Sequence, residues 1–305
     1  RARLLILKLV MKKALITGIN GFTGYYVAKE LELAGWEVWG IGSQPHSDIT
    51  DRYRQVELLD REALEGAVSE IKPHAVIHLA AIAFVAHSNA EAFYRVNIVG
   101  TRNLLAALAT CEQVPECVLL ASSANIYGNS TEGVLSELAA VHPANDYAVS
   151  KLAMEFMARL WLDRLPIVIA RPFNYTGVGQ SESFLLPKIV AHFRRQESII
   201  ELGNLDISRD FSDVRTVAKA YRRLLEVRPV GETVNVCSGK ATSLREVLSL
   251  VSEISGQKIE VQVNPAFVRA NDVKELCGDS SKLRSLVGDM ESPALSDTLR
   301  WMIEA

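Results

Sequence analysis

The chain lacks the features that mark membrane-spanning, disulfide-rich and nucleic-acid-binding proteins. No apolar run in its 305 residues approaches the roughly 18 residues that a membrane-spanning helix needs. Its four cysteines form no CxxC pair and its six histidines are not clustered around them, so we expect free thiols in a reducing cytoplasm and no metal site. The net charge is −3 at pH 7 with no basic stripe, which argues against a nucleic-acid partner.

What remains is the composition of a globular protein, with 49% hydrophobic and 23% charged residues. Between Lys12 and Arg171 short apolar runs alternate with longer helical stretches. The apolar runs are residues 14–17, 37–41, 75–79, 117–121 and 167–170, and the helical stretches are residues 25–34, 61–70, 92–108 and 147–162. This alternation predicts an α/β fold, with a doubly wound parallel sheet of the Rossmann type covered by helices on both faces.

The regular alternation ends after Arg171, where Gly, Ser and Asn become more frequent and the expected helices are shorter. We therefore expect a core formed by residues 11–172 together with about 209–238, and a smaller, mostly C-terminal lobe formed by about 173–208 and 239–305. Residues 1–10 are basic and apolar, and the Met-Lys-Lys that follows reads like a natural start before the first strand. We expect residues 1–10 to be an upstream or cloning-derived extension outside the fold.

A glycine-rich turn, residues 18–24, follows the first expected strand and leads into a helix. Gly18, Gly21 and Gly24 permit a tight turn, a close approach of the backbone to a pyrophosphate, and close packing of the helix on the strand. The N-terminus of the following helix would face the phosphates with the positive end of its dipole. The position of this turn between a strand and a helix predicts a dinucleotide-binding site.

The residues after the second expected strand bear on the choice of cofactor. A carboxylate there, about 20 residues after the turn, would hydrogen-bond the adenosine ribose of NAD. This chain has Gly42, Ser43 and Gln44 instead, and its next acid is Asp48. The small polar loop leaves room for a 2′-phosphate and favours NADP(H), while NAD(H) remains possible because no arginine follows the strand immediately.

Tyr147 and Lys151 are four residues apart and therefore project from one face of the expected helix. A tyrosine with its ordinary pKa of about 10 is a poor proton-transfer catalyst at neutral pH. We expect the neighbouring ammonium to lower the pKa of the phenol and so fit it for proton transfer to or from a carbonyl or alcohol. Ser122 and Ser123 end the preceding strand, where a hydroxyl can hydrogen-bond the same oxygen.

These motifs, in this order over residues 11–290, resemble the nucleotide-sugar branch of the extended short-chain dehydrogenase/reductase superfamily. The matching segments are residues 17–24, 78–81, 97–101, 122–128, 147–151 and 170–174. The resemblance implies that Ser123, Tyr147 and Lys151 are the catalytic residues, and that Lys151 also binds the nicotinamide ribose. It implies cofactor contacts from Gly18, Asn20, Gly21, Phe22, Thr23, Gly24, Ser43, Glu57, Leu58, Leu79, Ala80, Ala81, Asn97, Tyr147, Lys151 and Arg171.

Three features indicate which members of the nucleotide-sugar branch this chain resembles. Ala124 and Asn125 stand where the nucleotide-sugar dehydratases carry an acidic pair, so elimination of water has no proton shuttle here. Residues 207–214 resemble the stretch that contacts the sugar diphosphate in that branch. Residues 269–276 and 278–282 resemble the GDP-sugar members, in which an arginine and an acid bind the nucleotide end. The implied substrate contacts are Ser122, Asn125, Asn174, Arg209, Arg269 and Asp272.

The strongest resemblance is to the reductases that act on GDP-4-keto-6-deoxy-D-mannose. We therefore expect NADPH-dependent reduction of the C4 ketone of this GDP-linked sugar to GDP-D-rhamnose, with Tyr147 as the proton donor. The resemblance also implies a cytoplasmic homodimer without a membrane partner. Two alternatives stay open: an NAD-dependent nucleotide-sugar 4-epimerase, which shares the three catalytic residues, and a non-catalytic nucleotide-sensing protein, which typically loses the tyrosine or the lysine.

Overall fold

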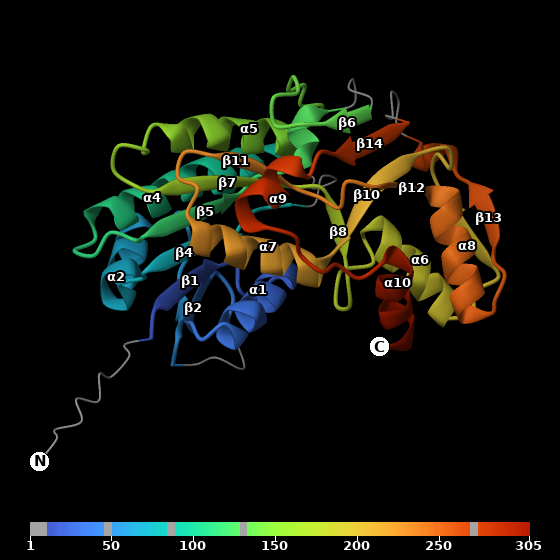
Figure 1. The fold of residues 1–305 in the computed structure, drawn as a ribbon, viewed down its shortest axis with the longest axis horizontal. Coiled ribbons are helices and arrows are strands. Elements are labelled where there is room, and N and C mark those ends of the chain that lie inside the picture. The colour runs from blue at the N-terminus through green and yellow to red at the C-terminus, as the bar shows by residue number, and fades with distance from the viewer. Residues whose placement is uncertain (1–10, 46–50, 84–88, 129–132, 269–273) are drawn as a thin grey trace, which may run out of the picture.

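Seven parallel strands form the central sheet in the computed structural model, which describes residues 11–45, 51–83, 89–128, 133–268 and 274–305 (Figure 1). Their order across the sheet is β11, β7, β5, β4, β1, β2, β3. Because the chain starts inside the sheet and builds outward in both directions, the sheet is doubly wound, as the sequence predicts. The strands are β1 (Lys13–Thr17), β2 (Glu37–Gly42), β3 (Tyr53–Gln55), β4 (Ala75–His78), β5 (Cys117–Ala121), β7 (Ile167–Pro172) and β11 (Thr233–Val236).

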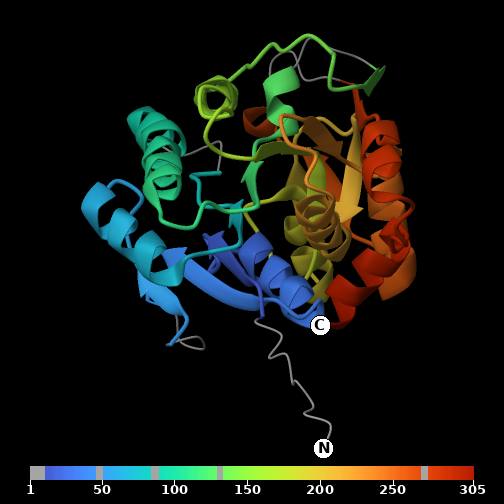
Figure 2. The ribbon, with the colours of Figure 1, turned by 60° about the vertical axis from the view of Figure 1, so that its left-hand side comes forward.

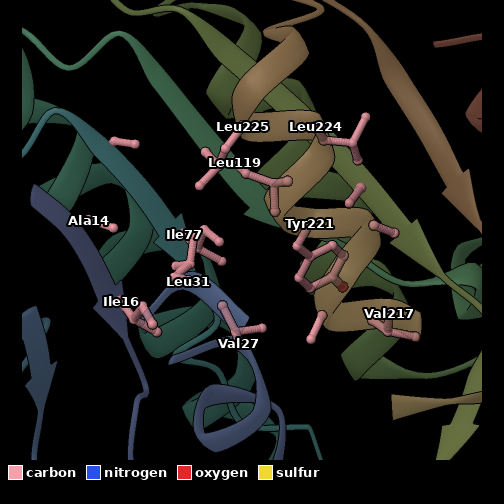
Figure 3. Packing of buried hydrophobic residues seen from close by; sticks show 14 of the residues in the cluster. Ala14, Ile16, Val27, Leu31, Ile77, Leu119, Val217, Tyr221, Leu224 and Leu225 are labelled. Atoms are coloured by element: carbon pink, nitrogen blue, oxygen red, sulfur yellow. The ribbon is translucent and has the colours of Figure 1, made fainter. Parts of the chain in front are cut away.

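Successive residues of each strand point to opposite layers of helices. Ile16 and Ile77 pack with α1 and α7 in one apolar cluster, which Figure 3 shows with Tyr221 of α7 at its centre. Leu15 and Val76 pack on the other face. The first layer contains α1 (Phe22–Leu33), α7 (Val214–Val227) and α9 (Ser281–Val287), and the second contains α2 (Arg61–Ile71), α4 (Thr101–Thr110) and α5 (Asp146–Arg159).

A smaller lobe lies beside the sheet and contains its own strands and helices (Figure 1). Its sheet has the order β12, β10, β14, β6, with β8 paired to β10, and β9 and β13 form a separate parallel pair. These strands are β6 (Gly133–Leu135), β8 (Asn174–Thr176), β9 (Ile199–Leu202), β10 (Ser208–Asp213), β12 (Ala241–Ser243), β13 (Glu260–Val263) and β14 (Glu275–Gly278). The lobe's apolar cluster is built by α6 (Leu185–Arg194), α8 (Leu244–Ser255) and α10 (Leu295–Glu304).

The path of the chain between these two units is more interleaved than the sequence pattern indicates. Strand β6 precedes residue 172 but pairs with β14 in the smaller sheet. Strand β10 begins where we expect the chain to return to the core, yet it also pairs in the smaller sheet. The proposed boundaries of the two units therefore remain predictions. In Figure 2 the blue and teal N-terminal elements lie opposite the orange and red C-terminal ones.

The long helix expected over residues 92–108 is broken into three pieces. They are α3 (Ala90–Tyr94), a π-helical turn (Arg95–Gly100) and α4. The wide turn presents Asn97 inward, where its side chain is buried, and the Thr101 hydroxyl donates to the Asn97 carbonyl at 2.7 Å. None of the helices in the described ranges combines the length and the apolar character needed to traverse a bilayer.

Candidate active site

A cavity of about 770 Å³ lies between the carboxyl edge of the central sheet and the smaller lobe. Its wall on the sheet side contains the glycine turn and the residues that follow β5. On the lobe side it contains Ile207, Phe211 and Leu244. The predicted site residues that line it are Gly18, Gly21, Phe22, Thr23, Gly24, Leu79, Ala81, Ser122, Ser123, Asn125, Tyr147, Lys151, Asn174 and Arg209.

The glycine turn gives one end of the cavity a backbone surface without side chains. Gly18 has a φ of +75°, and a Cβ there would lie 2.8 Å from the backbone nitrogen of Ala80. A Cβ on Gly24 would lie 2.4 Å from the carbonyl oxygen of Gly18, so α1 and the turn touch at the backbone. Helix α1 begins after Gly21 with no side chain capping its first N–H groups. These uncapped amides at the positive end of a helix fit the pyrophosphate of a dinucleotide.

The contacts predicted for the adenosine end lie outside the lining of this cavity. The Asn20 amide donates to the carbonyl of Gln44 at 3.0 Å and thereby holds the residues after β2. Ser43 and Glu57 are exposed, whereas Leu58 is buried in the core under α2. The roles of these four residues toward a cofactor remain predictions.

Ser123, Tyr147 and Lys151 come together in the wall of the cavity. Helix α5, which Asn145 caps, carries the tyrosine and the lysine one turn apart. Ser123 follows β5, and its hydroxyl is hydrogen-bonded to the phenol of Tyr147. The ammonium of Lys151 donates to the carbonyl of Ala121 at 2.7 Å. The three residues that the sequence proposes for catalysis thus form one cluster.

Burial governs the proton affinities of this cluster. It raises the pKa of Tyr147 to about 12, although the hydrogen bond with Ser123 acts in the opposite direction. It lowers the pKa of Lys151 to about 8, against the attraction of Glu155. The expectation that Lys151 lowers the phenol pKa is therefore wrong for this structure, because withdrawal from water dominates and the ammonium is directed to the carbonyl of Ala121. A phenol with so high a pKa is protonated at neutral pH, so Tyr147 is in the form that a proton donor requires, although it is a weak acid in this structure.

Asn97 lies behind the cluster and not in the cavity wall. Its amide oxygen accepts the N–H of Ile82 at 3.0 Å, and its amide nitrogen donates to the hydroxyl of Ser150 at 2.9 Å. It therefore ties the segment after β4 to α5, and its role toward the cofactor remains a prediction.

Arg171 is also outside the lining, because its guanidinium is fully engaged within the core. It donates to both carboxylate oxygens of Glu155, at 2.9 and 2.7 Å, and to the hydroxyl of Tyr127 at 3.0 Å. The structure does not bring it to the cavity.

Ser122 does line the cavity, but its hydroxyl donates to Glu155 at 2.6 Å. Sequence reasoning overlooked Glu155, whose one signal is an acid spaced four residues from Lys151 on a helix.

The predicted substrate contacts are divided between described and undescribed residues. Asn125, Asn174 and Arg209 line the cavity, the last from β10 with its guanidinium donating to the carbonyl of the preceding residue at 2.8 Å. Arg269 and Asp272 lie outside the described residues.

Sequence reasoning also overlooked aromatic residues in the cavity wall. Phe184 and Phe267 line the lobe end, and no motif in the sequence marks them. Tyr175 of β8 lines the wall beside the glycine turn, where its hydroxyl lies 2.8 Å from that of Thr23 and its ring stacks on Phe22. Across the described ranges no group of three or more His, Cys, Asp and Glu side chains is arranged to hold a metal ion.

Comparison with known families agrees with this architecture. Residues 15–302 match the family described as GDP-mannose 4,6 dehydratase. The chain belongs to this family. Membership in the GDP-mannose 4,6 dehydratase family confirms the sequence-based assignment to the nucleotide-sugar branch of the extended short-chain dehydrogenases/reductases, and with it an enzyme whose cofactor class is NAD(P).

Two relatives are similar to this chain over nearly its whole length. GDP-6-deoxy-D-talose 4-dehydrogenase of Aggregatibacter actinomycetemcomitans is 35% identical over 278 residues, which are 91% of this chain and 92% of the relative. GDP-6-deoxy-D-mannose reductase of Pseudomonas aeruginosa is 33% identical over 300 residues, which are 95% of each chain.

Two solved structures of similar proteins have nearly the same fold. A Burkholderia cenocepacia J2315 protein, provisionally described as an epimerase, is 55% identical with a TM-score of 0.91, over 96% of this chain and 97% of the other. RMD from Pseudomonas aeruginosa in complex with NADPH is 30% identical with a TM-score of 0.85, again over 96% and 97% of the two chains.

Proposed function

We propose that this protein reduces the C4 ketone of GDP-4-keto-6-deoxy-D-mannose with NADPH and forms GDP-D-rhamnose. The observation that carries the proposal is the cluster of Ser123, Tyr147 and Lys151 in the wall of a cavity that also contains the uncapped N-terminus of α1. One cavity therefore offers a proton donor for a carbonyl and backbone amides for a dinucleotide. The similarity to GDP-6-deoxy-D-mannose reductase supports the GDP-linked substrate.

NADPH, when bound, supplies the hydride that attacks the C4 carbon. Its preference over NADH is supported by the absence of a carboxylate from residues 42–45, because a carboxylate there would repel the 2′-phosphate. The structure of RMD with NADPH is a second support. NADH remains the weaker alternative.

In the proposed reaction the residues of this chain orient the ketone and supply a proton. Tyr147 donates its phenolic proton to the C4 oxygen as the ketone becomes an alcohol, and Ser123 hydrogen-bonds the same oxygen. Lys151 binds the cofactor ribose and thereby orients the cofactor toward the ketone.

The remainder of the substrate occupies the lobe side of the cavity. Asn125 and Asn174 contact the sugar, and the guanidinium of Arg209 pairs with the diphosphate, for which a planar cation is well suited. Arg269 and Asp272, placed by resemblance alone, contact the nucleotide end. Binding energy from these remote groups orients the ketone against the cofactor.

Two incubations followed by product analysis test the proposal. With GDP-mannose alone we expect no 4-keto product, because Ala124 and Asn125 supply no acid–base pair for elimination. With GDP-4-keto-6-deoxy-D-mannose and NADPH we expect NADPH oxidation and GDP-D-rhamnose. Dehydration of GDP-mannose by this chain would overturn the reductase assignment, and GDP-6-deoxy-D-talose as the product would overturn the assigned stereochemistry at C4.

A nucleotide-sugar 4-epimerase is the second candidate, favoured by the provisional description of the Burkholderia cenocepacia protein. An epimerase retains its NAD through purification and turns over without consuming added cofactor. We expect instead that the purified protein shows no nucleotide absorbance and consumes one NADPH for each sugar reduced.

We propose that the protein forms a homodimer, so that its partner is a second copy of this chain. Phe156 of α5 is 61% exposed and Leu160, directly after this helix, is 80% exposed, while Val149 on α5 is 37% exposed. A row of apolar side chains on a helix surface fits burial against the same helix of another copy. Phe156→Asp should therefore convert a dimer to a monomer in light scattering, whereas a monomeric wild type would remove this proposal.

A further inference from the structure

Three consecutive residues, the last of β5 and the two that follow it, contact three residues of α5 that are one turn apart. The carbonyl of Ala121 accepts from Lys151, and the hydroxyl of Ser123 is hydrogen-bonded to Tyr147. Between them, Ser122 donates to Oε1 of Glu155 at 2.6 Å. The middle contact is therefore positioned to fix the backbone from which both outer contacts are made.

Glu155 is suited to hold this corner rigidly. Its side chain has no exposed surface, and it is paired with Arg171, whose side chain is 6% exposed. That arginine makes two parallel hydrogen bonds to the carboxylate and a third to the hydroxyl of Tyr127. A bidentate, buried pair of this kind fixes the carboxylate in one orientation.

The charge of Glu155 also acts on the lysine one turn earlier. Glu155 favours the ammonium form of Lys151, and burial opposes it. Glu155 itself faces two cations, Arg171 and Arg159, whose Nη2 lies 3.6 Å from its carboxylate. The titratable groups that face Lys151 and Tyr147 also include His78 of β4, Tyr175 of β8 and Tyr221 of α7. Burial lowers the pKa of His78 and raises the pKa of both phenols, so these three groups are neutral near pH 7. Glu155 therefore supplies the negative charge that opposes the effect of burial and favours the protonated form of Lys151.

We propose that Glu155 is a positioning residue for the proton-donating cluster, acting through Ser122 on the corner after β5 and through its charge on Lys151. This inference rests on the proposed function, because it assigns the cluster a proton-transfer task. It also reassigns Ser122, which contacts the carboxylate instead of serving mainly as a substrate ligand.

The first test is the pH dependence of NADPH affinity, measured by fluorescence titration of the full chain from pH 6 to 10. Glu155→Gln keeps the size of the side chain and removes its charge. Wild type should lose affinity above about pH 8, where Lys151 loses its proton. In Glu155→Gln this loss should begin about one pH unit lower, because the lost carboxylate favoured the ammonium. The control is Glu30→Gln, which removes a carboxylate paired with Arg222 on α1 and α7 and should leave the profile unchanged.

The second test uses Ser122→Ala, which leaves the ion pair intact and so remains informative if Glu155→Gln does not fold. We expect about a ten-fold lower kcat with the keto sugar, an unchanged KM for it, and the wild-type pH midpoint for NADPH binding. Ser252→Ala, which removes a hydroxyl from α8, is the matched control and should retain wild-type kcat.

The outcomes separate this inference from the proposed function. An unmoved pH midpoint in folded Glu155→Gln overturns the role of the charge, and a kcat of Ser122→Ala within two-fold of wild type overturns the role of the contact. If wild type does not reduce the keto sugar, the proposed function fails, while the NADPH titrations still decide whether Glu155 acts on Lys151.

Discussion

His78 and Thr17 lie side by side at the ends of two neighbouring strands, with Nδ1 of the imidazole 2.6 Å from the threonine hydroxyl. The other ring nitrogen lies 2.8 Å from the hydroxyl of Thr101 at the start of α4. The imidazole therefore joins β1, β4 and α4 beneath the glycine turn. Burial, together with the charge of Lys151, lowers the pKa of His78 to about 3.

This buried imidazole predicts a pH-dependent stability. In the unfolded chain His78 takes up a proton near its ordinary pKa of about 6.5, whereas the folded protein holds it neutral down to about pH 3. Its contribution to the free energy of unfolding is thus fully present above pH 6.5 and is lost as the pH falls, by about 1.4 kcal/mol per pH unit. Urea unfolding of wild type and His78→Asn between pH 7 and 4 measures this slope. Equal slopes in the two proteins would contradict the prediction.

The phenol of Tyr147 is expected to act on turnover and not on cofactor affinity. Tyr147→Phe removes the proton donor but keeps the buried ring, so kcat should fall by about 100-fold or more. The Kd for NADPH should change less than two-fold, which fluorescence titration checks. Tyr25→Phe, at an exposed tyrosine of α1, is the control and should retain wild-type kcat. Near-normal turnover in Tyr147→Phe would exclude the phenol from the reaction.

Lys151 is expected to affect both properties. Lys151→Ala should weaken NADPH binding and also lower kcat, because in the proposed reaction the ammonium holds the ribose and thereby orients the cofactor toward the ketone. The two measurements are made on the same protein as for Tyr147→Phe. A variant that binds NADPH like wild type would show that the ammonium does not contact the cofactor.

The exposed side chain of Ser43 predicts a change in cofactor preference. Ser43→Asp places a carboxylate near the 2′-phosphate and should lower the ratio of kcat/KM for NADPH to that for NADH by about ten-fold. Ser43→Asn introduces a side chain of the same size as aspartate but without its charge, and serves as the control. The effect should shrink in high salt, because the site is exposed to solvent. A wild type that already prefers NADH would show that this loop has been misread.

Two glycine substitutions are expected to change stability in opposite directions. Gly24→Ala places a methyl group 2.4 Å from the Gly18 carbonyl and should cost about 1–3 kcal/mol of unfolding free energy and weaken NADPH binding. Gly66 lies within α2 with no atom within 4 Å of an added Cβ, so Gly66→Ala should stabilise the protein by about 0.5–1 kcal/mol. Thermal or urea unfolding measures both. Destabilisation by both variants would show that the close packing at Gly24 is not the cause.

The parts of the fold that the sequence predicts are those with a strong local pattern. The apolar run at 117–121 coincides with β5, because parallel strands buried on both faces are continuously apolar. Strands of three or four residues such as β6 and β14 have no such pattern, since their pairing depends on partners more than 100 residues away. The sequence has no local signal for the π-helical turn either, because Asn97 is held by contacts with Ile82 and Ser150, which lie 15 and 53 residues away.

The same distinction applies to the site. The glycine turn and the Tyr147–Lys151 spacing are local signals, and the sequence locates them. The contacts of Glu155 and Tyr175 arise only on folding, from segments that a linear pattern cannot relate. The direction of the pKa shift of Tyr147 could not be predicted for the same reason. The spacing indicates that Lys151 is a neighbour, but it does not indicate how far burial withdraws the phenol from water.

The interleaved path of the chain has a consequence for how the molecule can be divided. After β6 in the smaller sheet the chain returns to β7, leaves again for β8 and β10, returns for α7 and β11, and leaves once more for β12. No single backbone cut can therefore release either unit as an intact fragment. The chain crosses between the two walls of the cavity several times, so neither wall can be exchanged as a module by one crossover in the gene.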